Sequence, residues 1–250
     1  MDRQRFSFLA HSSLAIANPL SFLAIDQAID LLPVGRNSSA LDIGCGKAEW
    51  LIRLAEQKQV SGIGVDNAAL GHEAALVRLK ERSVSDRIWL HCSDAAIFVA
   101  AQKADSFDVV SCIGSSHALT DADTALEAMI RVCKPGGHLI LGEGYWQRSP
   151  DAAYLEVLGG SEKDLGSHRD NVTLGTSRGL IARGAWVSSP TDWDQYEWAY
   201  ARNIEDFARE NPDDPDKNAM IERCRSWRTT YLTWGRDTLG FGLYLFRKPV

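Results

Sequence analysis

A glycine-rich turn near the start of the chain is the strongest chemical signal in the sequence. An apolar run passes into a helical pattern through the stretch Leu41-Asp42-Ile43-Gly44-Cys45-Gly46-Lys47. Glycines at such a junction let the backbone turn sharply and approach a ligand with no side chain in the way. The stretch therefore predicts a ligand-binding turn between a strand and a helix.

Carboxylates follow three successive apolar runs. Asp42 precedes the glycines, Asp66 ends the next run twenty residues after Gly46, and Asp94 follows the third run. A carboxylate at position 66 can accept bonds from both hydroxyls of a ribose, and one at position 94 from an adenine amino group. Each aspartate alone is equally typical of a helix N-cap. Their shared position at strand ends favours a nucleoside site.

The charge of this site separates two cofactors. A nicotinamide dinucleotide would place its pyrophosphate at the helix N-terminus, where Asp42 would repel it. Its fingerprint also requires a third glycine where this chain has Glu49. S-adenosylmethionine has no phosphate and carries a sulfonium and an ammonium, which a carboxylate attracts. We therefore expect S-adenosylmethionine, with S-adenosylhomocysteine as its product.

The first 142 residues alternate between short β-branched runs and longer helical patterns. Strands are expected at residues 40–43, 62–65, 87–91, 107–112 and 138–141, with helices at 47–58, 68–82 and 121–133. Short continuous apolar runs joined by helices are typical of buried parallel strands. This alternation predicts a doubly wound α/β sheet that binds its ligand at the carboxyl ends of the strands.

The second part of the chain has a different pattern. A Gly-, Ser- and Asp-rich stretch at 142–179 precedes an expected strand at 180–187, helices at 192–209 and 217–230, and a last strand at 240–247. Six of the eight tryptophans lie here. We expect a cap over a pocket, formed by residues 143–179 and 191–239. Residues 1–37 are expected to be an N-terminal helical segment, and 38–142 the cofactor-binding core of a single domain.

The motif series resembles that of class I S-adenosylmethionine-dependent methyltransferases. The matching motifs are D-x-G-x-G at 42–46, Asp66, Ser93-Asp94-Ala95, Phe107-Asp108-Val109-Val110 and Lys134-Pro135-Gly136-Gly137. The resemblance implies a mostly parallel, seven-stranded Rossmann-like sheet in which residues 240–247 run antiparallel beside 180–187. It implies the following cofactor contacts: Asp42, Gly44, Cys45, Gly46, Asp66, Asn67, Ser93, Asp94, Ala95, Cys112 and Ile113. Ala48 departs from the pattern, which often has a third glycine there, so we expect a slightly shifted helix.

A narrower resemblance covers most of the chain. Glu143-Gly144-Tyr145-Trp146, residues 193–197, residues 211–214 and Gly240-Phe241-Gly242 are similar to a family of uncharacterised bacterial methyltransferases. Residues 11–19, just before the expected first helix, also share this similarity. The resemblance sharpens the fold and leaves the substrate open.

Candidate acid–base residues lie after the fourth and fifth expected strands. His117, Glu143 and Tyr145 are the candidate catalytic residues. A base among them is needed only if the nucleophile must lose a proton during methyl transfer. Tyr145 and Trp146 are expected to wall an acceptor or enclose a cation. The loop at 112–117 lacks the D/N-P-P-Y/F sequence of amino-methylating DNA enzymes. It also lacks the carboxylates that a magnesium site requires, so no metal is expected.

The amino-acid composition limits which kinds of partner and which compartment are expected. The 250 residues carry a net charge of −6, which argues against nucleic acid as a partner. Five cysteines without a C-x-x-C pair favour reduced thiols in the cytoplasm. No membrane span or secretory leader is expected, since His11 and Ser12 interrupt the N-terminal apolar stretch. We expect a small-molecule acceptor. A cofactor-binding sensor without turnover and a protein or RNA methyltransferase remain alternatives, and the oligomeric state stays open.

Overall fold

The computed structural model describes all 250 residues and contains one seven-stranded sheet. The strands lie in the order β3-β2-β1-β4-β5-β7-β6. Their bounds are β1 (Ser39–Ile43), β2 (Ser61–Asp66), β3 (Ile88–Cys92), β4 (Phe107–Ile113), β5 (Cys133–Trp146), β6 (Ile181–Val187) and β7 (Leu239–Arg247). The first five strands run parallel, and β7 runs antiparallel between β5 and β6. The predicted seven-stranded mixed sheet and its antiparallel last strand are confirmed.

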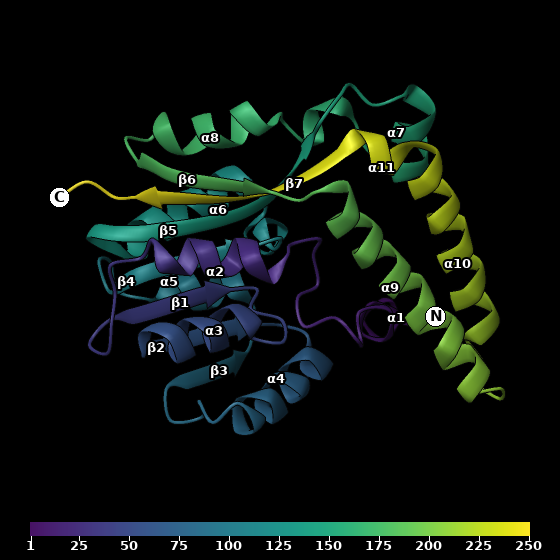
Figure 1. Ribbon diagram of the computed structural model, residues 1–250, viewed down its shortest axis with the longest axis horizontal. Coiled ribbons are helices and arrows are strands. Elements are labelled where there is room, and N and C mark those ends of the chain that lie inside the picture. The colour runs from purple at the N-terminus through teal and green to yellow at the C-terminus, as the bar shows by residue number, and fades with distance from the viewer.

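Helices cover both faces of the sheet (Figure 1). The α-helices are α1 (Arg3–Ala10), α2 (Phe22–Asp30), α3 (Glu49–Lys58), α4 (Ala69–Glu81), α5 (Ala95–Ala101), α6 (Ala122–Val132), α7 (Ala152–Leu158), α8 (His168–Thr176), α9 (Pro190–Glu210), α10 (Lys217–Thr230) and α11 (Arg236–Thr238). Short turns η1 (Ser116–Leu119), η2 (Glu162–Asp164) and η3 (Tyr231–Gly235) join some of them. Apolar residues of α2, α3 and α4 pack on one face, and those of α5, α6 and α8 pack on the other.

Strand alternation explains these two cores. Ala40 in β1 packs toward α2 and α3, whereas Leu41 and Ile43 pack toward α5 and α6. All three side chains are buried, as expected for a central parallel strand covered on both faces. The arrangement brings the carboxyl ends of β1, β2 and β4 to one edge, where their loops can form a site.

Strand β5 is much longer than the expected strand at 138–141. Glu143 was expected at the end of that strand, but it lies inside β5, opposite Gly242 of β7, and Tyr145 lies opposite Gly240. The long antiparallel partner β7 provides the hydrogen bonds that extend β5. A Cβ atom at Gly240 would lie 2.2 Å from the Tyr145 ring, so glycine is needed beside this aromatic side chain.

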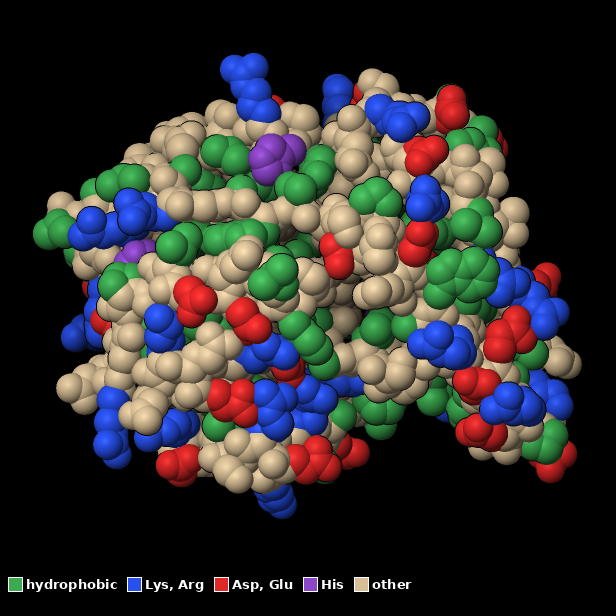
Figure 2. Space-filling view, in the orientation of Figure 1, with side chains coloured by type: hydrophobic (Ala, Val, Ile, Leu, Met, Phe, Trp, Pro, Cys, Tyr) green, Lys and Arg blue, Asp and Glu red, His purple; other side chains and the backbone are tan.

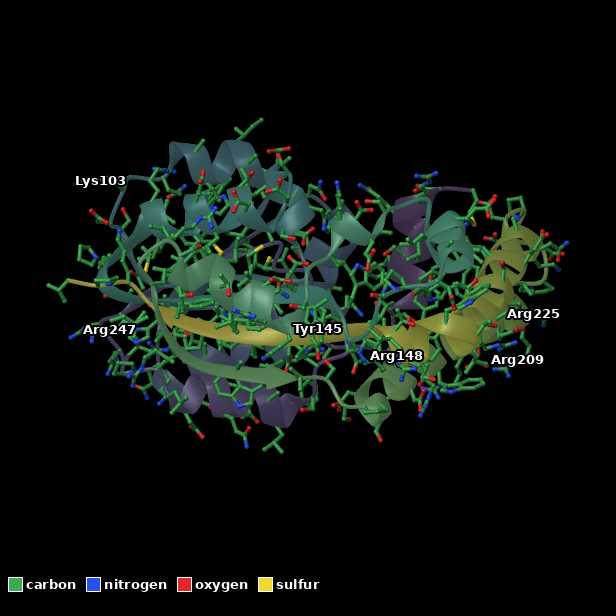
Figure 3. All side chains as sticks on the ribbon, turned by 90° about the horizontal axis from the view of Figure 1, so that it is seen from above. Lys103, Tyr145, Arg148, Arg209, Arg225 and Arg247 are labelled. Atoms are coloured by element: carbon green, nitrogen blue, oxygen red, sulfur yellow. The ribbon has the colours of Figure 1, made fainter.

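Helices α9 and α10 form an antiparallel arm that leaves the sheet (Figure 1). In the view from above, Arg209 and Arg225 mark its far end, whereas Tyr145 lies over the sheet (Figure 3). The space-filling view shows a hollow between this arm and the body, with mixed acidic and basic side chains on the arm (Figure 2). None of these helices is both long enough and apolar enough to span a membrane.

Helix α1 packs against the arm and was not expected as a separate element. The first helix was expected after residue 19, where α2 does form. Asp2 caps α1 by accepting hydrogen bonds from the backbone N–H groups of Gln4 and Arg5. Phe6 and Ala10, one helical turn apart, are buried against apolar residues of α9 and α10: Ala201, Ile204, Met220 and Cys224. This tertiary packing stabilises a helix that is short and weakly amphipathic by itself.

Candidate active site

The glycine turn after β1 has the geometry that its sequence predicts. The N–H groups of Gly44 and Cys45 both donate to the carbonyl of Val65, at 2.8 and 3.1 Å. Gly44 has a φ of +70°, and a Cβ atom there would lie 2.2 Å from the Cβ of Ser115. No other residue fits at this position, because the loop after β4 lies directly over the turn.

Asp66 ties this turn to the end of β2. Its Oδ2 accepts a hydrogen bond from the Gly46 N–H at 2.9 Å, and its Oδ1 accepts one from the Ala68 N–H at 2.9 Å. Each carboxylate oxygen can accept a further bond, so the side chain keeps capacity for two ligand hydroxyls. Asp66 thus holds the turn in shape and also faces the cavity that the turn encloses.

Asp42 is buried beneath the turn. It is only 3% exposed, and the Ser111 hydroxyl donates to its Oδ1 at 2.6 Å. Burial, with a smaller contribution from the nearby Asp66, raises the pKa of Asp42 to about 7. A buried carboxylate in this state attracts a cationic group, since a neighbouring positive charge favours its ionised form.

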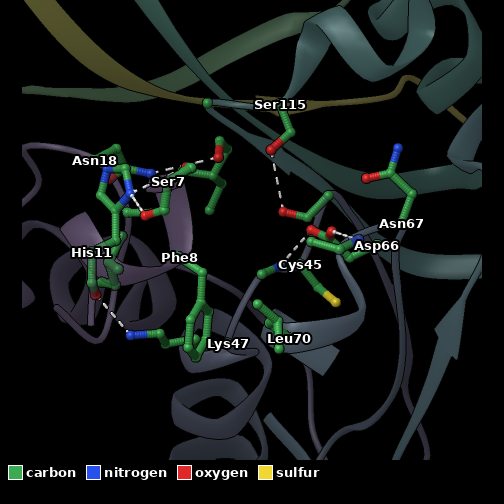
Figure 4. A pocket seen from close by; sticks show the side chains of 18 of the residues that line it. Ser7, Phe8, His11, Asn18, Cys45, Lys47, Asp66, Asn67, Leu70 and Ser115 are labelled. Carbon is green, nitrogen blue, oxygen red and sulfur yellow. Dashed lines mark hydrogen bonds between the residues drawn. The ribbon is translucent and has the colours of Figure 1, made fainter. Parts of the chain in front are cut away.

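A cavity of about 570 Å³ lies above these three residues. Its floor contains Asp42, the turn at 44–47, residues 66–71 and the end of β4 at 113–115. Its roof is the N-terminal part of the chain, including Ser7, Phe8, His11 and residues 15–18 (Figure 4). The volume lies within the range of small-molecule sites. The expected cofactor-binding residues and the N-terminal roof therefore line the same cavity.

The roof of this cavity is not formed by the expected cap, although part of the segment 143–179 lines the second cavity described below. No residue of 143–179 or 191–239 lines this cavity. Those segments instead form the arm and the layer around α7 and α8, because their aromatic side chains pack on one another. Tyr154, for example, stacks on Trp234 with ring centroids 5.9 Å apart. The tryptophan-rich composition thus reflects packing in the second half of the chain.

The expected adenine contacts lie beside the cavity. Asp94 accepts a hydrogen bond from the Ile97 N–H at 2.9 Å and so caps α5. The Ser93 hydroxyl is buried without a hydrogen-bond partner. Cys112 is fully buried in the core. Of the expected set, the cavity is lined by Asp42, Gly44, Cys45, Gly46, Asp66, Asn67 and Ile113, and not by Ser93, Asp94, Ala95 or Cys112.

Two of the three candidate catalytic residues line a second, smaller cavity. Glu143 and His117 line a space of about 240 Å³, and His117 lines the large cavity as well. The Oε2 atom of Glu143 is buried without a hydrogen-bond partner, and burial raises the pKa of this carboxyl group. Tyr145 lines neither space. The expected aromatic wall is also absent, because the Trp146 indole donates to the Glu162 carbonyl at 2.9 Å.

Similarity to known proteins agrees with this geometry. Residues 40–137 match a family model described as a methyltransferase domain. The uncharacterised protein YjhP of Escherichia coli is 27% identical, and the alignment covers 98% of each chain. The crystal structure of YjhP superposes with a TM-score of 0.89 at 25% identity, over 97% of this chain and 98% of that chain. The chain belongs to the class I S-adenosylmethionine-dependent methyltransferases.

Other relatives of this methyltransferase match in fold or over half of the chain. A methyltransferase from Geobacter sulfurreducens, solved with S-adenosyl-L-homocysteine, has a TM-score of 0.89 at 23% identity, over 97% of both chains. A demethylmenaquinone methyltransferase of Lactiplantibacillus plantarum is 32% identical over 46% of this chain. A 27-O-demethylrifamycin SV methyltransferase of Amycolatopsis mediterranei is 33% identical over 50%. This chain spans about half the length of these last two enzymes, 48% and 45%.

The site of the methyltransferase fits its cofactor. The buried Asp42 suits a cationic group, Asp66 has free acceptor capacity for hydroxyls, and Gly44 leaves the backbone bare at the point of approach. The structure contains no group of three or more His, Cys, Asp or Glu side chains arranged to hold a metal ion. Independence from metal stays a prediction.

Sequence reasoning missed the N-terminal roof of the methyltransferase site. Ser7, Phe8, His11 and Asn18 line the large cavity, although they precede the first motif by more than twenty residues. One signal pointed there, the resemblance noted at residues 11–19, and Asp2 as a typical N-cap residue could have been a second. Neither signal shows which strand ends this part of the chain covers, because that depends on its packing against α9.

Proposed function

We propose that this methyltransferase binds S-adenosylmethionine on the turn at 44–46. It would methylate a small molecule in the space next to the bound cofactor. The observation that carries the proposal is the large cavity, in which Asp42, the glycine turn and Asp66 face a roof made by the same chain. A roof of this kind limits the size of the acceptor. The net charge of −6 also disfavours nucleic acid.

Each residue of the turn has a role in cofactor binding under this proposal. Asp42 would attract the cationic methionine end, and Asp66 would accept the ribose hydroxyls with help from Asn67. Ser93, Asp94 and Ala95 would meet the adenine from the end of β3, where the Ser93 hydroxyl still lacks a partner. Cys112 would contribute through its backbone only, since its side chain is buried in the core, and Ile113 lies beside it. When bound, the cofactor supplies a methyl group on a positively charged sulfur.

The protein's contribution to transfer is mainly orientation. Holding acceptor and donor in line can supply about 7–11 kcal/mol of the barrier. The loop at 113–115, next to the turn, leaves room for an approaching nucleophile, because Gly114 has no side chain. Two of the relatives described above are named for small-molecule acceptors, demethylmenaquinone and 27-O-demethylrifamycin SV. Their names support a small-molecule acceptor for this enzyme.

Glu143 is our first candidate for a base, and His117 the second. Glu143 has an unpartnered buried oxygen, and burial raises the pKa of its carboxyl group, which makes the carboxylate a stronger base. His117 lies between the two cavities and links them. Glu143→Gln should lower turnover by about 10²–10⁴-fold, the range of general-base catalysis, with cofactor affinity within a few-fold. Unchanged turnover would move the role to His117; Tyr145, outside both cavities, is the weakest candidate.

A labelled-cofactor assay tests the proposed function. The enzyme is incubated with methyl-labelled S-adenosylmethionine and either the small-molecule or the macromolecular fraction of a bacterial extract. We expect label in the small-molecule fraction, and less label with the Asp66→Ala variant at a limiting cofactor concentration, because that variant should bind the cofactor more weakly. Label in protein or RNA would replace the proposed acceptor class. Cofactor binding without transfer to any fraction would favour a sensor. All five cysteines are free thiols, which agrees with the proposed cytoplasmic location.

A further inference from the structure

Lys47, the residue after the glycine turn, contacts the N-terminal part of the chain. Its ammonium donates to the carbonyls of His11, Ser12 and Leu14, at 2.8, 2.8 and 2.9 Å. Figure 4 shows the bond to His11. An ammonium has three N–H donors, so each is used by one carbonyl. All three N–H donors of this lysine are thus used by a segment that is distant in the sequence.

These carbonyls follow the C-terminal end of α1. The last carbonyls of a helix lack partners within the helix, and a cation there interacts favourably with the helix dipole. Lys47 also lies 5.8 Å from the centroid of the Phe8 ring in α1. The lysine therefore acts as a C-terminal cap that comes from another part of the chain.

The other side of this segment is fixed to the arm. The Asn203 amide donates to the Ala10 carbonyl at 2.9 Å. The His11 Nδ1 donates to the Ser7 carbonyl at 2.7 Å, which leaves Nε2 to accept from the Tyr196 hydroxyl at 2.8 Å. Helix α1 is thereby anchored to α9 by two side-chain hydrogen bonds.

Lys47 is the link between these two parts. Apart from its three bonds, no hydrogen bond or ion pair joins residues 2–14 to the sheet or its loops. Of the residues that it holds, His11 lines the large cavity together with the cofactor turn, and Ser12 and Leu14 lie in the same N-terminal segment. Further along the roof, the Asn18 amide donates to the Ile113 carbonyl at 3.5 Å. Without Lys47, the roof would be held by this longer bond, by packing and by its anchors on the arm.

We propose that Lys47 is a positioning residue for methyl transfer, whose ammonium holds residues 11–14, and with them α1, over the bound cofactor. This proposal rests on the proposed function, because it assigns the floor of the same cavity to the cofactor. It follows that the acceptor meets a complete wall only while this contact exists. Lys47 acts through the N-terminal segment and does not touch the reacting atoms.

Hydrogen exchange and ligand release test this role. Amide exchange in α1 is followed by mass spectrometry for the wild type, Lys47→Met and Lys47→Arg, with and without S-adenosylhomocysteine. Dissociation of that ligand is measured by stopped flow. Lys58→Met is the matched control, because Lys58 ends α3 and donates to the Asp30 carbonyl at 3.3 Å, away from the cavity. A guanidinium retains enough donors for the three carbonyls.

We expect α1 amides of Lys47→Met to exchange about tenfold faster, since three carbonyls that follow the helix lose their charge-assisted partner. Ligand release should become several-fold faster. Lys47→Arg should restore most of the wild-type exchange rate and release rate, and Lys58→Met should resemble the wild type.

The proposal would be overturned if α1 of Lys47→Met exchanged at the wild-type rate. It would also be overturned if exchange became faster while ligand release stayed unchanged. If Lys47→Met does not fold, Lys47→Gln takes its place, and unfolding of both would assign Lys47 to the fold. If the wild type binds no S-adenosylhomocysteine, the proposed function fails, while exchange in the free protein still tests the contact.

Discussion

At the scale of single residues, the site depends on two carboxylates with different surroundings. Asp66 is satisfied by two backbone N–H groups at 2.9 Å, whereas Asp42 is buried and has only the Ser111 hydroxyl as its partner. Burial raises the pKa of Asp42 to about 7. Its charge therefore changes within the range of ordinary assay conditions, and a bound cation would shift the balance toward the ionised form.

Cofactor affinity should consequently depend on pH. The ionised form of Asp42 attracts the ammonium of S-adenosylhomocysteine, and the protonated form does not. Because the pKa in the free protein is about 7, affinity should be greatest above that value and fall as the pH decreases through it. If one proton is involved, the affinity changes by at most about tenfold per pH unit. Calorimetry between pH 5.5 and 8.5 measures this, and Asp42→Asn should flatten the profile. An equally steep profile in that variant would assign the proton to another group.

Asp66 allows a test of the nucleoside end of the site. Asp66→Ala should weaken S-adenosylmethionine binding by about 1–3 kcal/mol, because ligand hydroxyls and the Gly46 N–H lose their acceptor. Asp86→Ala removes an exposed aspartate after α4 and should leave affinity unchanged. Calorimetry with S-adenosylmethionine and with NAD distinguishes the cofactors, since NAD should not bind. Tight NAD binding or full affinity in Asp66→Ala would refute the assignment.

The sequence was sufficient for some of these residues and not for others. Gly44, Gly46 and Asp66 could be predicted, because a tight turn and a strand end restrict which residue types fit. The contact of Lys47 with residues 11–14 could not be predicted, since it depends on how a distant helix folds over the turn. Glu143 was expected beside the same cleft as His117, and both residues line the smaller cavity. Its place inside β5 was not foreseen, and its catalytic role stays a prediction.

At the scale of elements, both ends of α3 are unusual. The residue before the helix, Ala48, has a φ of +60°, and the residue after it, Gln59, has a φ of +58°. Both values lie in the left-handed region, which favours glycine. Ala48 is the position where the class often has a third glycine. The helix still begins at Glu49, so alanine is accommodated by a strained backbone conformation.

Replacement of Gln59 should therefore stabilise the protein. Gln59 is exposed and its backbone is left-handed, so Gln59→Gly should raise the free energy of unfolding by about 1 kcal/mol. As the opposite control, Glu73→Gly at an exposed position inside α4 should lower it by about 1 kcal/mol. Urea denaturation measures both. A loss of stability in Gln59→Gly would show that the glutamine side chain contributes more than its backbone costs.

Most elements could be predicted because their patterns are local. The strands at 62–65 and 107–112 and the helices at 47–58 and 121–133 agree with β2, β4, α3 and α6 within two residues. The error at β5 has a non-local cause: residues 142–146 contain two glycines and become a strand only because β7 pairs with them. Helix α1 was missed for the same kind of reason, since α9 and α10 provide the surface that stabilises it.

At the scale of the whole molecule, the apolar core has three parts. Two clusters lie on opposite faces of the sheet, and the third joins α1 to the arm. The third cluster is small and contains Phe6 and Ala10 of α1, with α9 and α10 contributing the rest. A small cluster of this kind can open locally while the sheet stays folded. The roof of the cavity thus belongs to the least strongly packed part of the methyltransferase.

A pair of core substitutions tests this division. Phe6→Ala removes a side chain that is only 4% exposed, which costs about 3–5 kcal/mol where a core unfolds as one unit. We expect that loss to act locally, so that α1 exchanges faster and S-adenosylhomocysteine dissociates faster, while urea unfolding of the sheet changes by less than about 1 kcal/mol. Leu126→Ala, a fully buried change in α6, should instead lower global stability by about 2–5 kcal/mol. If Phe6→Ala destabilises the sheet as strongly as Leu126→Ala, the arm and the sheet unfold as one unit, and the roof cannot move independently of the catalytic core.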